Sequence, residues 1–388
     1  MKISPAIRVF TLTTAFLFLL ISAPITRNAV LLVAYVLLSL YVVLSRVRLF
    51  SGLRIRESAA IAIIGLSLTL MLPISVMRNA TALIHFYVAM ISLGCAYVLS
   101  RNIDAYLAAS RISLIAAQLI LLAYVASIGL ADYPLENLFS HTSSNGITSA
   151  LILIQVNYST VKYLVTRRAS LLTSTLTLIV CLIGFGRASI LAAAAVVLVN
   201  LLFQLSWRSH WRALTTALLI ASVSAAVHFA GDHDIVRLVQ ANTKIGAGLH
   251  DEPRERMITD YLDQIDAGTL ITGASYHGTS IEAEFSGNPH NSYIRAHHIF
   301  GLPYLLSMLL LPVLLLWHRE QPTLRLYSVC MLAIVLTRSF SEPLLFPTPF
   351  DFYFFAICFA LGGGVGRIRH TQESRLEQVK ALEGRVAS

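Results

Sequence analysis

The sequence predicts an all-α polytopic membrane protein with about twelve transmembrane helices and one large outward loop containing amphipathic helices. Three observations lead to this fold class. Of the 388 residues, 56% are hydrophobic and only 13% are charged, whereas a globular protein has about 25% charged residues. The apolar residues gather in long runs. Lysine and arginine gather in alternate connections between those runs.

Runs of about 20 apolar residues are long enough to cross a bilayer as helices. Twelve such runs occur, at 7–25, 28–45, 58–76, 80–99, 110–131, 146–165, 169–186, 188–206, 212–230, 298–317, 323–341 and 349–366. The chain thus divides into nine helices within 1–230, a polar loop over 231–297, three helices within 298–367 and a tail over 368–388. The first run follows Lys2 and Arg8 without a cleavage site for a signal peptide, so we expect it to be a retained helix.

The distribution of positive charge predicts the topology. With a cytoplasmic N-terminus, most of the 29 lysines and arginines fall in cytoplasmic connections, as the positive-inside rule requires. Twelve spans then place both termini in the cytoplasm. This distribution accounts for the net charge of +9, so we expect membrane lipids and no nucleic acid as partners. The outward side retains Arg27, Arg78, Arg187, Arg237, Lys244, Arg254, Arg256, Arg295 and Arg338.

The outward loop predicts one clear helix, over 253–266. Its apolar residues recur at helical spacing, and Pro253 suits the first turn. We expect this amphipathic helix to lie against the membrane face. Glycines follow it at 273, 278 and 287, where the chain returns to the membrane. The apolar positions are Met257, Ile258, Tyr261, Leu262 and Ile265.

Known cofactor and metal motifs are missing from the sequence. The four cysteines lie far apart within apolar runs, which is typical of buried small hydrophobic residues. A metal site combining His290 with His297 and His298 is not expected, because their spacing does not bring three imidazoles to one helical face. The pair Asp232 and Asp234 forms a DHD sequence on the outward side, away from cytoplasmic nucleotides. We therefore expect no metal and no cofactor. The cysteines are Cys95, Cys181, Cys330 and Cys358.

Outward arginines need an explanation, because outward loops are usually poor in positive charge. Arg187 lies in the tight connection GFGRAS, and Arg254 and Arg256 open the predicted loop helix. Arg295 and Arg338 lie near the outward ends of the tenth and eleventh runs. Guanidinium groups bind diphosphate oxygens through paired hydrogen bonds, so converging arginines suit a lipid-linked diphosphate. The alternative is that they reach lipid head groups or pair with Glu342 and the loop carboxylates.

A polar junction, NPHNSYIRAHHIFGLPYL at 288–305, joins the outward loop to the tenth apolar run. Polar residues at the membrane are a functional-site hypothesis, because they are costly there. His290 can act as a general base, since its unperturbed pKa is about 6.5. A structural hydrogen-bonding role is the alternative. His141, Asp132 and Glu136 either line the same cavity or are solvated loop residues.

The junction carries a recognisable motif. His290-Asn291 is followed by nine residues, then by Gly301 and, three positions later, by Tyr304. This matches the pattern H-[NSQ]-x9-G-x-x-[GTY], and on it the chain resembles the O-antigen ligase and polymerase superfamily of bacterial inner membranes. Other similar features are Arg187 in GRAS and a large loop with an arginine-led helix at Arg254 and a following glycine, Gly273. Two departures are Ile258 in place of the family's usual aromatic residue, and the arginine pair 254/256, in which register favours Arg254.

The resemblance implies a GT-C-like, metal-independent and inverting glycosyltransferase, with its active site facing the periplasm. The implied donor is an undecaprenyl-diphosphate-linked polysaccharide, and the implied acceptor is a sugar hydroxyl of lipid A-core. His290 would deprotonate or orient the acceptor, and Arg187 and Arg254 would bind the diphosphate as catalytic residues. Substrate binding is then the expected role of a further set: Asn291, Tyr293, Arg256, Arg295 and Arg338.

Three alternatives remain open from the sequence. A polymerase or a protein glycosyltransferase of the same superfamily would share the donor and differ in the acceptor. A flippase for lipid-linked polysaccharides would scatter polar residues through the spans and would not depend on His290. However, the predicted spans hold few carboxylates, which argues against an ion-coupled transporter. The oligomeric state, the polysaccharide and the choice between Arg254 and Arg256 are not determined.

Overall fold

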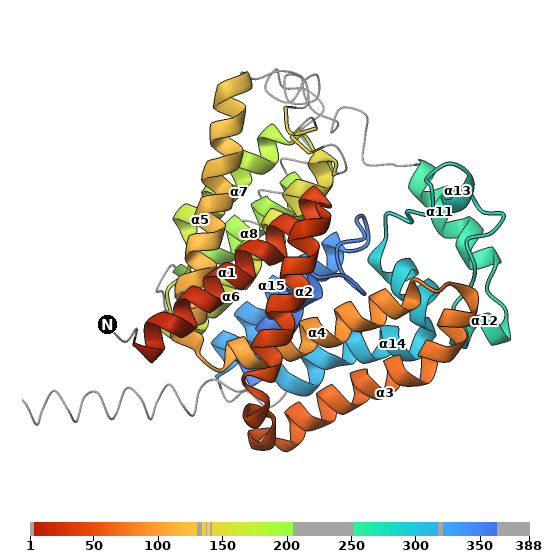
Figure 1. The fold of residues 1–388 in the computed structure, drawn as a ribbon. Helices are drawn as coiled ribbons and strands as arrows, with labels where there is room; N and C mark the ends of the chain where they lie inside the picture. The colour runs from red at the N-terminus through yellow and green to blue at the C-terminus, as the bar shows by residue number, and fades with distance from the viewer. Residues whose placement is uncertain are drawn as a thin grey trace, which may run out of the picture.

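The computed structural model describes residues 4–129, 134–136, 138–139, 142–204, 252–316 and 321–362. Within these ranges the secondary structure is helical and no residue forms a strand (Figure 1). The helices of the first half are α1 Pro5–Thr26, α2 Ala29–Leu44, η1 Val47–Gly52, α3 Ile55–Arg78, α4 Ala82–Ser100, α5 Ile103–Ile128, α6 Ser144–Thr166, α7 Leu171–Ile183 and α8 Arg187–Gln204. Those that follow are α11 Glu252–Asp263, α12 Ala267–Thr272, α13 Ser280–Ala283, α14 Ser292–Leu316, α15 Pro322–Arg338 and a last helix, Asp351–Gly362.

Each predicted apolar run coincides with a helix, except 212–230, which lies outside the described residues. Six of the described helices are long and apolar enough to cross a membrane: α1, α3, α4, α5, α8 and α14. The helices α2, α7 and Asp351–Gly362 are apolar but shorter. The fold is therefore all-helical and indicates a multi-pass membrane protein, while the number of twelve spans stays a prediction.

Helix α6 is largely enclosed, because α5, α7, α8 and α15 all contact it. Its polar side chains are buried and bonded to neighbouring helices. The hydroxyl of Tyr106 donates to the Asn157 Oδ1 at 2.9 Å, and the Gln155 Nε2 donates to the Thr173 hydroxyl at 3.2 Å. Buried polar groups are tolerated where they are hydrogen-bonded. This explains how a helix too polar for direct contact with lipid occupies the middle of the helical bundle.

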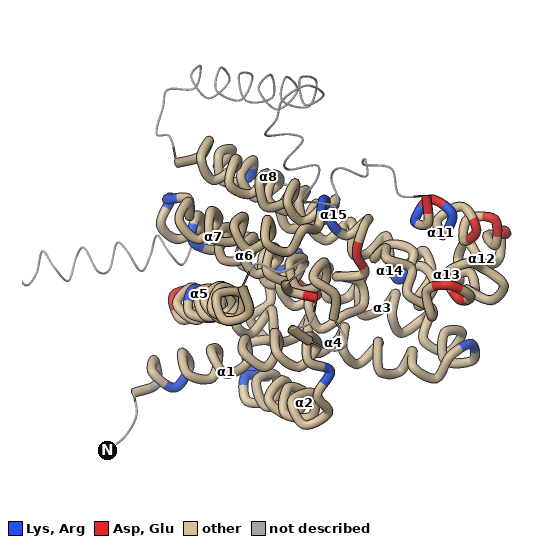
Figure 2. The backbone as a smooth tube through the Cα atoms, turned by 90° about the horizontal axis from the view of Figure 1, so that it is seen from above, with Lys and Arg blue, Asp and Glu red and all other residues tan. Residues whose placement is uncertain are grey.

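The predicted loop helix is present as α11, but its apolar residues pack against the protein itself rather than facing the membrane as expected. Met257 and Tyr261 are buried, and they cluster with Ala274, Ile281 of α13 and Ile294 of α14. Leu262, which the sequence places on the same face, is instead 57% exposed. The apolar face of α11 thus packs on its own loop and on α14. In Figure 2 the Asp and Glu positions of this region, coloured red, lie along and next to α11, α12 and α13.

Two glycines allow the backbones of α12 and α14 to touch. A Cβ at Gly273 would lie 2.0 Å from the carbonyl oxygen of His297, and a Cβ at Gly301 would lie 2.0 Å from that of Ile271. Both glycines have positive φ, 93° and 68°, a conformation that costs little only for glycine. At Gly301 the backbone of α14 leaves helical geometry. The motif glycine therefore has a structural reason: it admits the α12 backbone to the side of α14.

The arginine at the end of α3 secures the same contact. The Arg78 guanidinium donates to the carbonyl of Gly273 and, at 2.5 Å, to that of Thr272. These carbonyls end α12 and have no partner within that short helix. Arg78 thus ties α3 to the turn that rests on α14.

We predict that Gly273→Ala destabilises the protein more than Gly278→Ala does. Gly278 also has positive φ, 76°, but a Cβ at this position would meet no atom within 4 Å. Gly278→Ala should therefore lower the free energy of unfolding only by the cost of a left-handed alanine, about 1–2 kcal/mol. At Gly273 the backbone of α14 must also move, which adds about 1–3 kcal/mol. Thermal unfolding of both variants in detergent micelles measures the difference, and equal losses would contradict the close approach.

Candidate functional site

His290 lies in a strained turn just before α14. Its φ is 45°, in the left-handed region that is uncommon for residues other than glycine. Its backbone N–H donates to the Asn288 Oδ1 at 3.1 Å. The imidazole meets the Phe285 ring edge to face, with centroids 6.0 Å apart. The turn therefore presents a partly exposed histidine in a defined place at the end of the loop.

Asn291 and Tyr293 hold the start of α14. The Asn291 Oδ1 accepts the backbone N–H groups of Tyr293 at 2.8 Å and of Ile294 at 3.1 Å, which caps the helix. The Tyr293 hydroxyl donates to the Leu336 carbonyl of α15 at 2.7 Å. Both side chains are thus engaged by the protein. These contacts fix the beginning of α14, directly after His290, and the predicted substrate-binding role of the two residues stays a prediction. The helix begins at Ser292, ahead of the apolar run at 298–317, so Arg295 and His297 are helical residues.

Arg338 is buried at 3% exposure and is engaged by three groups. Its guanidinium donates to the Ser341 hydroxyl at 2.5 Å and to the Ser189 hydroxyl at 3.2 Å. It also lies 3.8 Å from the Glu342 carboxylate. This is the alternative that the sequence left open for the outward arginines: Arg338 pairs with Glu342 and links α15 to the beginning of α8, two residues beyond Arg187.

The two loop arginines differ in their surroundings. Arg256 forms a half-exposed ion pair with Glu284, with a separation of 3.3 Å. Arg254 is partly buried, and its positive charge acts on Arg338. Arg256 is thus engaged by the neighbouring loop. Of the two, Arg254 is the one whose charge acts on Arg338, the residue that donates to Ser189 near the start of α8.

His297 and Tyr261 form a structural hydrogen-bond network. The His297 Nε2 lies 2.8 Å from the Leu270 carbonyl oxygen, which only accepts, so this nitrogen carries the proton. The Nδ1 accepts from the Tyr261 hydroxyl at 2.8 Å, and this hydroxyl accepts from the backbone N–H of Ala274 at 3.3 Å. Burial raises the pKa of Tyr261 above its ordinary range, which keeps it a donor. Both nitrogens of His297 are used in this way. Among the described residues, no group of histidine, cysteine and carboxylate side chains is arranged to hold a metal ion.

A polar cavity of about 400 Å³ lies beside the loop turn, and we call it the arginine cavity. Arg27 reaches it from the end of α1, His85 from α4, and Arg295 and His298 from α14. Residues 286–289 form its wall next to His290. An adjoining cavity of the same volume shares His85 and His298 and extends to Arg78.

Sequence reasoning included Arg295 in the site but not Arg27, His85 or His298. Arg27 was visible as an outward arginine, yet its place beside Arg295 depends on the packing of α1 near α14. His85 carries no sequence signal, since it is a single histidine in an apolar run. The predicted loop residues His141 and Asp132, and the DHD sequence, lie outside the described residues. Glu136 accepts the backbone N–H of Ser144 at 3.1 Å, which is a capping role.

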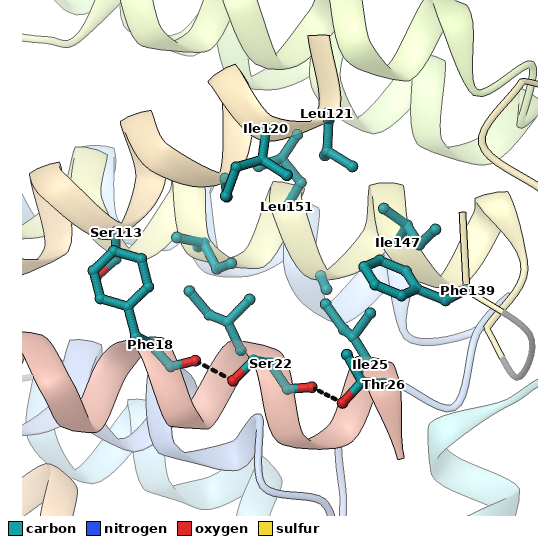
Figure 3. A pocket seen from close by; sticks show the side chains of 14 residues that line it. Phe18, Ser22, Ile25, Thr26, Ser113, Ile120, Leu121, Phe139, Ile147 and Leu151 are labelled. Atoms are coloured by element: carbon teal, nitrogen blue, oxygen red, sulfur yellow. Dashed lines mark hydrogen bonds between the residues drawn. The ribbon is translucent and has the colours of Figure 1, made fainter. Parts of the chain in front are cut away.

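A third cavity, of about 150 Å³, is almost entirely apolar and lies between α1, α5 and α6 (Figure 3). Phe18 and Ile25 enter it from α1, Leu121 from α5 and Leu151 from α6. The Ser22 and Thr26 hydroxyls at its edge donate to carbonyls within α1 at 2.8 Å. The lining therefore offers hydrocarbon surface with its polar groups already bonded, which suits an acyl or isoprenoid chain.

Comparison with known proteins does not add to this picture: no protein-family model, curated protein or solved structure matches the chain. The resemblance to the O-antigen ligase and polymerase superfamily rests on its motif residues and stays a prediction.

We predict that Arg338→Gln destabilises the fold by about 3–5 kcal/mol, because it leaves Glu342 buried without its charge partner. Arg256→Gln should cost less than about 1 kcal/mol, since its pair with Glu284 is half exposed to solvent. Chemical unfolding in detergent measures both values. The double variant Arg338→Gln with Glu342→Gln should recover part of the loss; no recovery would show that the pair is not the source of the effect.

Proposed function

We propose that the protein is a glycosyltransferase of the bacterial inner membrane, an O-antigen ligase. It transfers a polysaccharide from undecaprenyl diphosphate to a sugar hydroxyl of lipid A-core, with inversion and without a metal. The observation that carries this proposal is that Arg338, which donates to Ser189 two residues after Arg187, also feels the charge of Arg254 and pairs with Glu342, whose carbonyl accepts from Ser292 two residues after His290.

His290 supplies the base. Its imidazole takes the proton of the acceptor hydroxyl, whose oxygen forms a bond to the anomeric carbon of the donor. The bond from that carbon to the diphosphate oxygen breaks, and its electron pair leaves with the diphosphate. Attack from the face opposite the leaving group inverts the anomeric centre. The left-handed turn at His290 and the cap of α14 by Asn291 fix the direction of the imidazole.

Arg187 and Arg254 stabilise the leaving diphosphate. Each lies in the first turn of a helix, α8 and α11, whose amino end contributes additional positive potential. Guanidinium groups that are fixed before the reaction stabilise the charge that develops in the transition state. Two arginines and two helix ends therefore supply the neutralisation that other diphosphate transferases obtain from a metal ion.

The apolar cavity supports a lipid-linked donor. Its walls are mostly apolar side chains of α1, α5 and α6, and Ile25 in its lining lies two residues from Arg27 of the arginine cavity. The apolar cavity matches an isoprenoid chain in the membrane, and the nearby arginines match a charged head group at the membrane surface. The proposed topology has both termini in the cytoplasm and the arginines facing the periplasm.

The experiment is transfer by the purified protein, in the presence of EDTA, from an undecaprenyl-diphosphate-linked glycan to lipid A-core. Glycan on lipid A-core supports the ligase. If the donor instead lengthens itself, the polymerase of the same superfamily replaces the ligase; if the glycan appears on protein, the protein glycosyltransferase does. If no transfer occurs and the lipid-linked glycan crosses a proteoliposome membrane, the protein is a flippase.

We predict that His290→Ala lowers the transfer rate by about 10²–10⁴-fold, the usual contribution of a general base, while the protein still inserts and folds.

Arg187→Ala should raise the KM for the donor by about tenfold or more, since it removes charge-assisted hydrogen bonds to the diphosphate. Arg48→Ala, an exposed arginine of η1, is the control. If His290→Ala transfers the glycan at the wild-type rate, His290 is not the general base.

A further inference from the structure

The arginine cavity gathers positive charge from segments far apart in the sequence. Arg27 is the residue that ends α1, and Arg295 lies in the first turns of α14. Their charges act on one another, and the charge of Arg295 also acts on His85 and His298. Such a cluster costs electrostatic free energy in the empty protein, and an anion in the cavity would offset that cost.

The protein supplies little negative charge of its own to this cavity. Among the described ion pairs, none includes Arg27 or Arg295. The carboxylate that acts on Arg295 is Asp351, and its oxygens already accept the backbone N–H groups of Phe346 and Thr348. Glu282 belongs to the adjoining cavity, where it accepts from the Gly278 N–H and lies 3.2 Å from His277. Arg295 itself donates to the Pro343 carbonyl at 3.4 Å, a long hydrogen bond that leaves most of its donors for a ligand.

Hydrogen-bond directions inside the cavity suit an anion as well. The His298 Nδ1 donates to the Ala274 carbonyl at 2.7 Å, so its Nε2 is the atom left for the cavity. Protonation of that nitrogen would make it a further donor to an anionic oxygen. The Tyr276 ring stacks on His298, with centroids 3.7 Å apart, and holds the imidazole in this orientation.

The cavity and the proposed diphosphate region are both connected to the short segment around His290. Asn288 and Pro289 line the cavity. Ser292 instead bonds to the carbonyl of Glu342 at 2.8 Å, and Glu342 is the partner of Arg338. His290 stands between these residues in the chain. A volume of about 400 Å³ falls in the range of small-molecule sites and exceeds what a single phosphate ion requires.

We propose that the arginine cavity binds a phosphorylated sugar of the acceptor, with the phosphoryl group held by Arg27 and Arg295. This rests on the proposed transferase function, since it assigns the acceptor to one side of His290 and the donor diphosphate to the other. The acceptor is thereby specified as an anionic, phosphate-bearing saccharide.

The first test measures binding without any reaction. Isothermal titration of the full chain in detergent uses glucose 1-phosphate as the probe and glucose as its uncharged counterpart. The wild type binds the phosphate-bearing sugar more tightly, and Arg27→Gln or Arg295→Gln weakens that binding about tenfold, the loss of one charge-assisted hydrogen bond. Arg48→Gln, on the exposed surface of η1, leaves it unchanged. Equal binding of the two sugars, or equal binding by wild type and Arg27→Gln, overturns the proposal.

If Arg295→Gln fails to fold, the titration of Arg27→Gln alone still tests the proposal. Its side chain is exposed at the end of α1, so its replacement leaves the buried contacts of α14 intact. Circular dichroism and size-exclusion chromatography confirm that each variant is folded before titration.

The second test identifies which substrate carries the phosphate. Transfer rates are compared for lipid A-core and for the same acceptor after phosphatase treatment. The acceptor KM of the wild type rises about tenfold on dephosphorylation, whereas Arg27→Gln shows a raised KM for both acceptors and little difference between them. A rise in the donor KM of Arg27→Gln, with the acceptor KM unchanged, overturns the assignment to the acceptor. If the wild type transfers nothing, the proposed function fails, and the titration still decides whether the cavity is a phosphosugar site.

Discussion

The contact between the backbone of residues 271–273 and α14 is the constraint on which the outward site depends. Side chains at Gly273 and Gly301 would place carbon atoms 2.0 Å from carbonyl oxygens across this contact. Arg78, at the end of α3, stabilises the contact by donating hydrogen bonds to two of the carbonyls that end α12. The loop from α12 to α14 is thereby fixed at its beginning, and the cap by Asn291 fixes its end. His290 and one wall of the arginine cavity lie on this loop, so the same contact fixes the position of both.

The outward arginines differ in what surrounds them. Arg78 caps a helix, Arg338 is buried against Glu342, and Arg256 pairs with Glu284 at the surface. Arg27 and Arg295 instead share a cavity, and neither takes part in a described ion pair. Because an opposite charge stabilises a charged group, two arginines that share a cavity suit an anionic ligand.

In the interior of the helical bundle, polar side chains are bonded to the protein itself. Polar side chains of α6 are enclosed by other helices and bonded to them, as in the contact of Tyr106 with Asn157. Polar residues in the spans thus have partners within the protein and form a stable core. Scattered polar residues were the feature expected of a flippase, but in α6 they serve helix packing, so their presence does not favour transport.

The sequence by itself determined the helical architecture, because runs of apolar residues and alternating positive charge are local properties that the bilayer imposes. It also determined α11, since the spacing of Met257 and Tyr261 is a property of one helix. The pairing of Arg256 with Glu284, the burial of Arg338 and the meeting of Arg27 with Arg295 were decided only by the tertiary structure. Each depends on side chains that come from different helices, and the relative rotation of those helices is set by packing rather than by sequence distance.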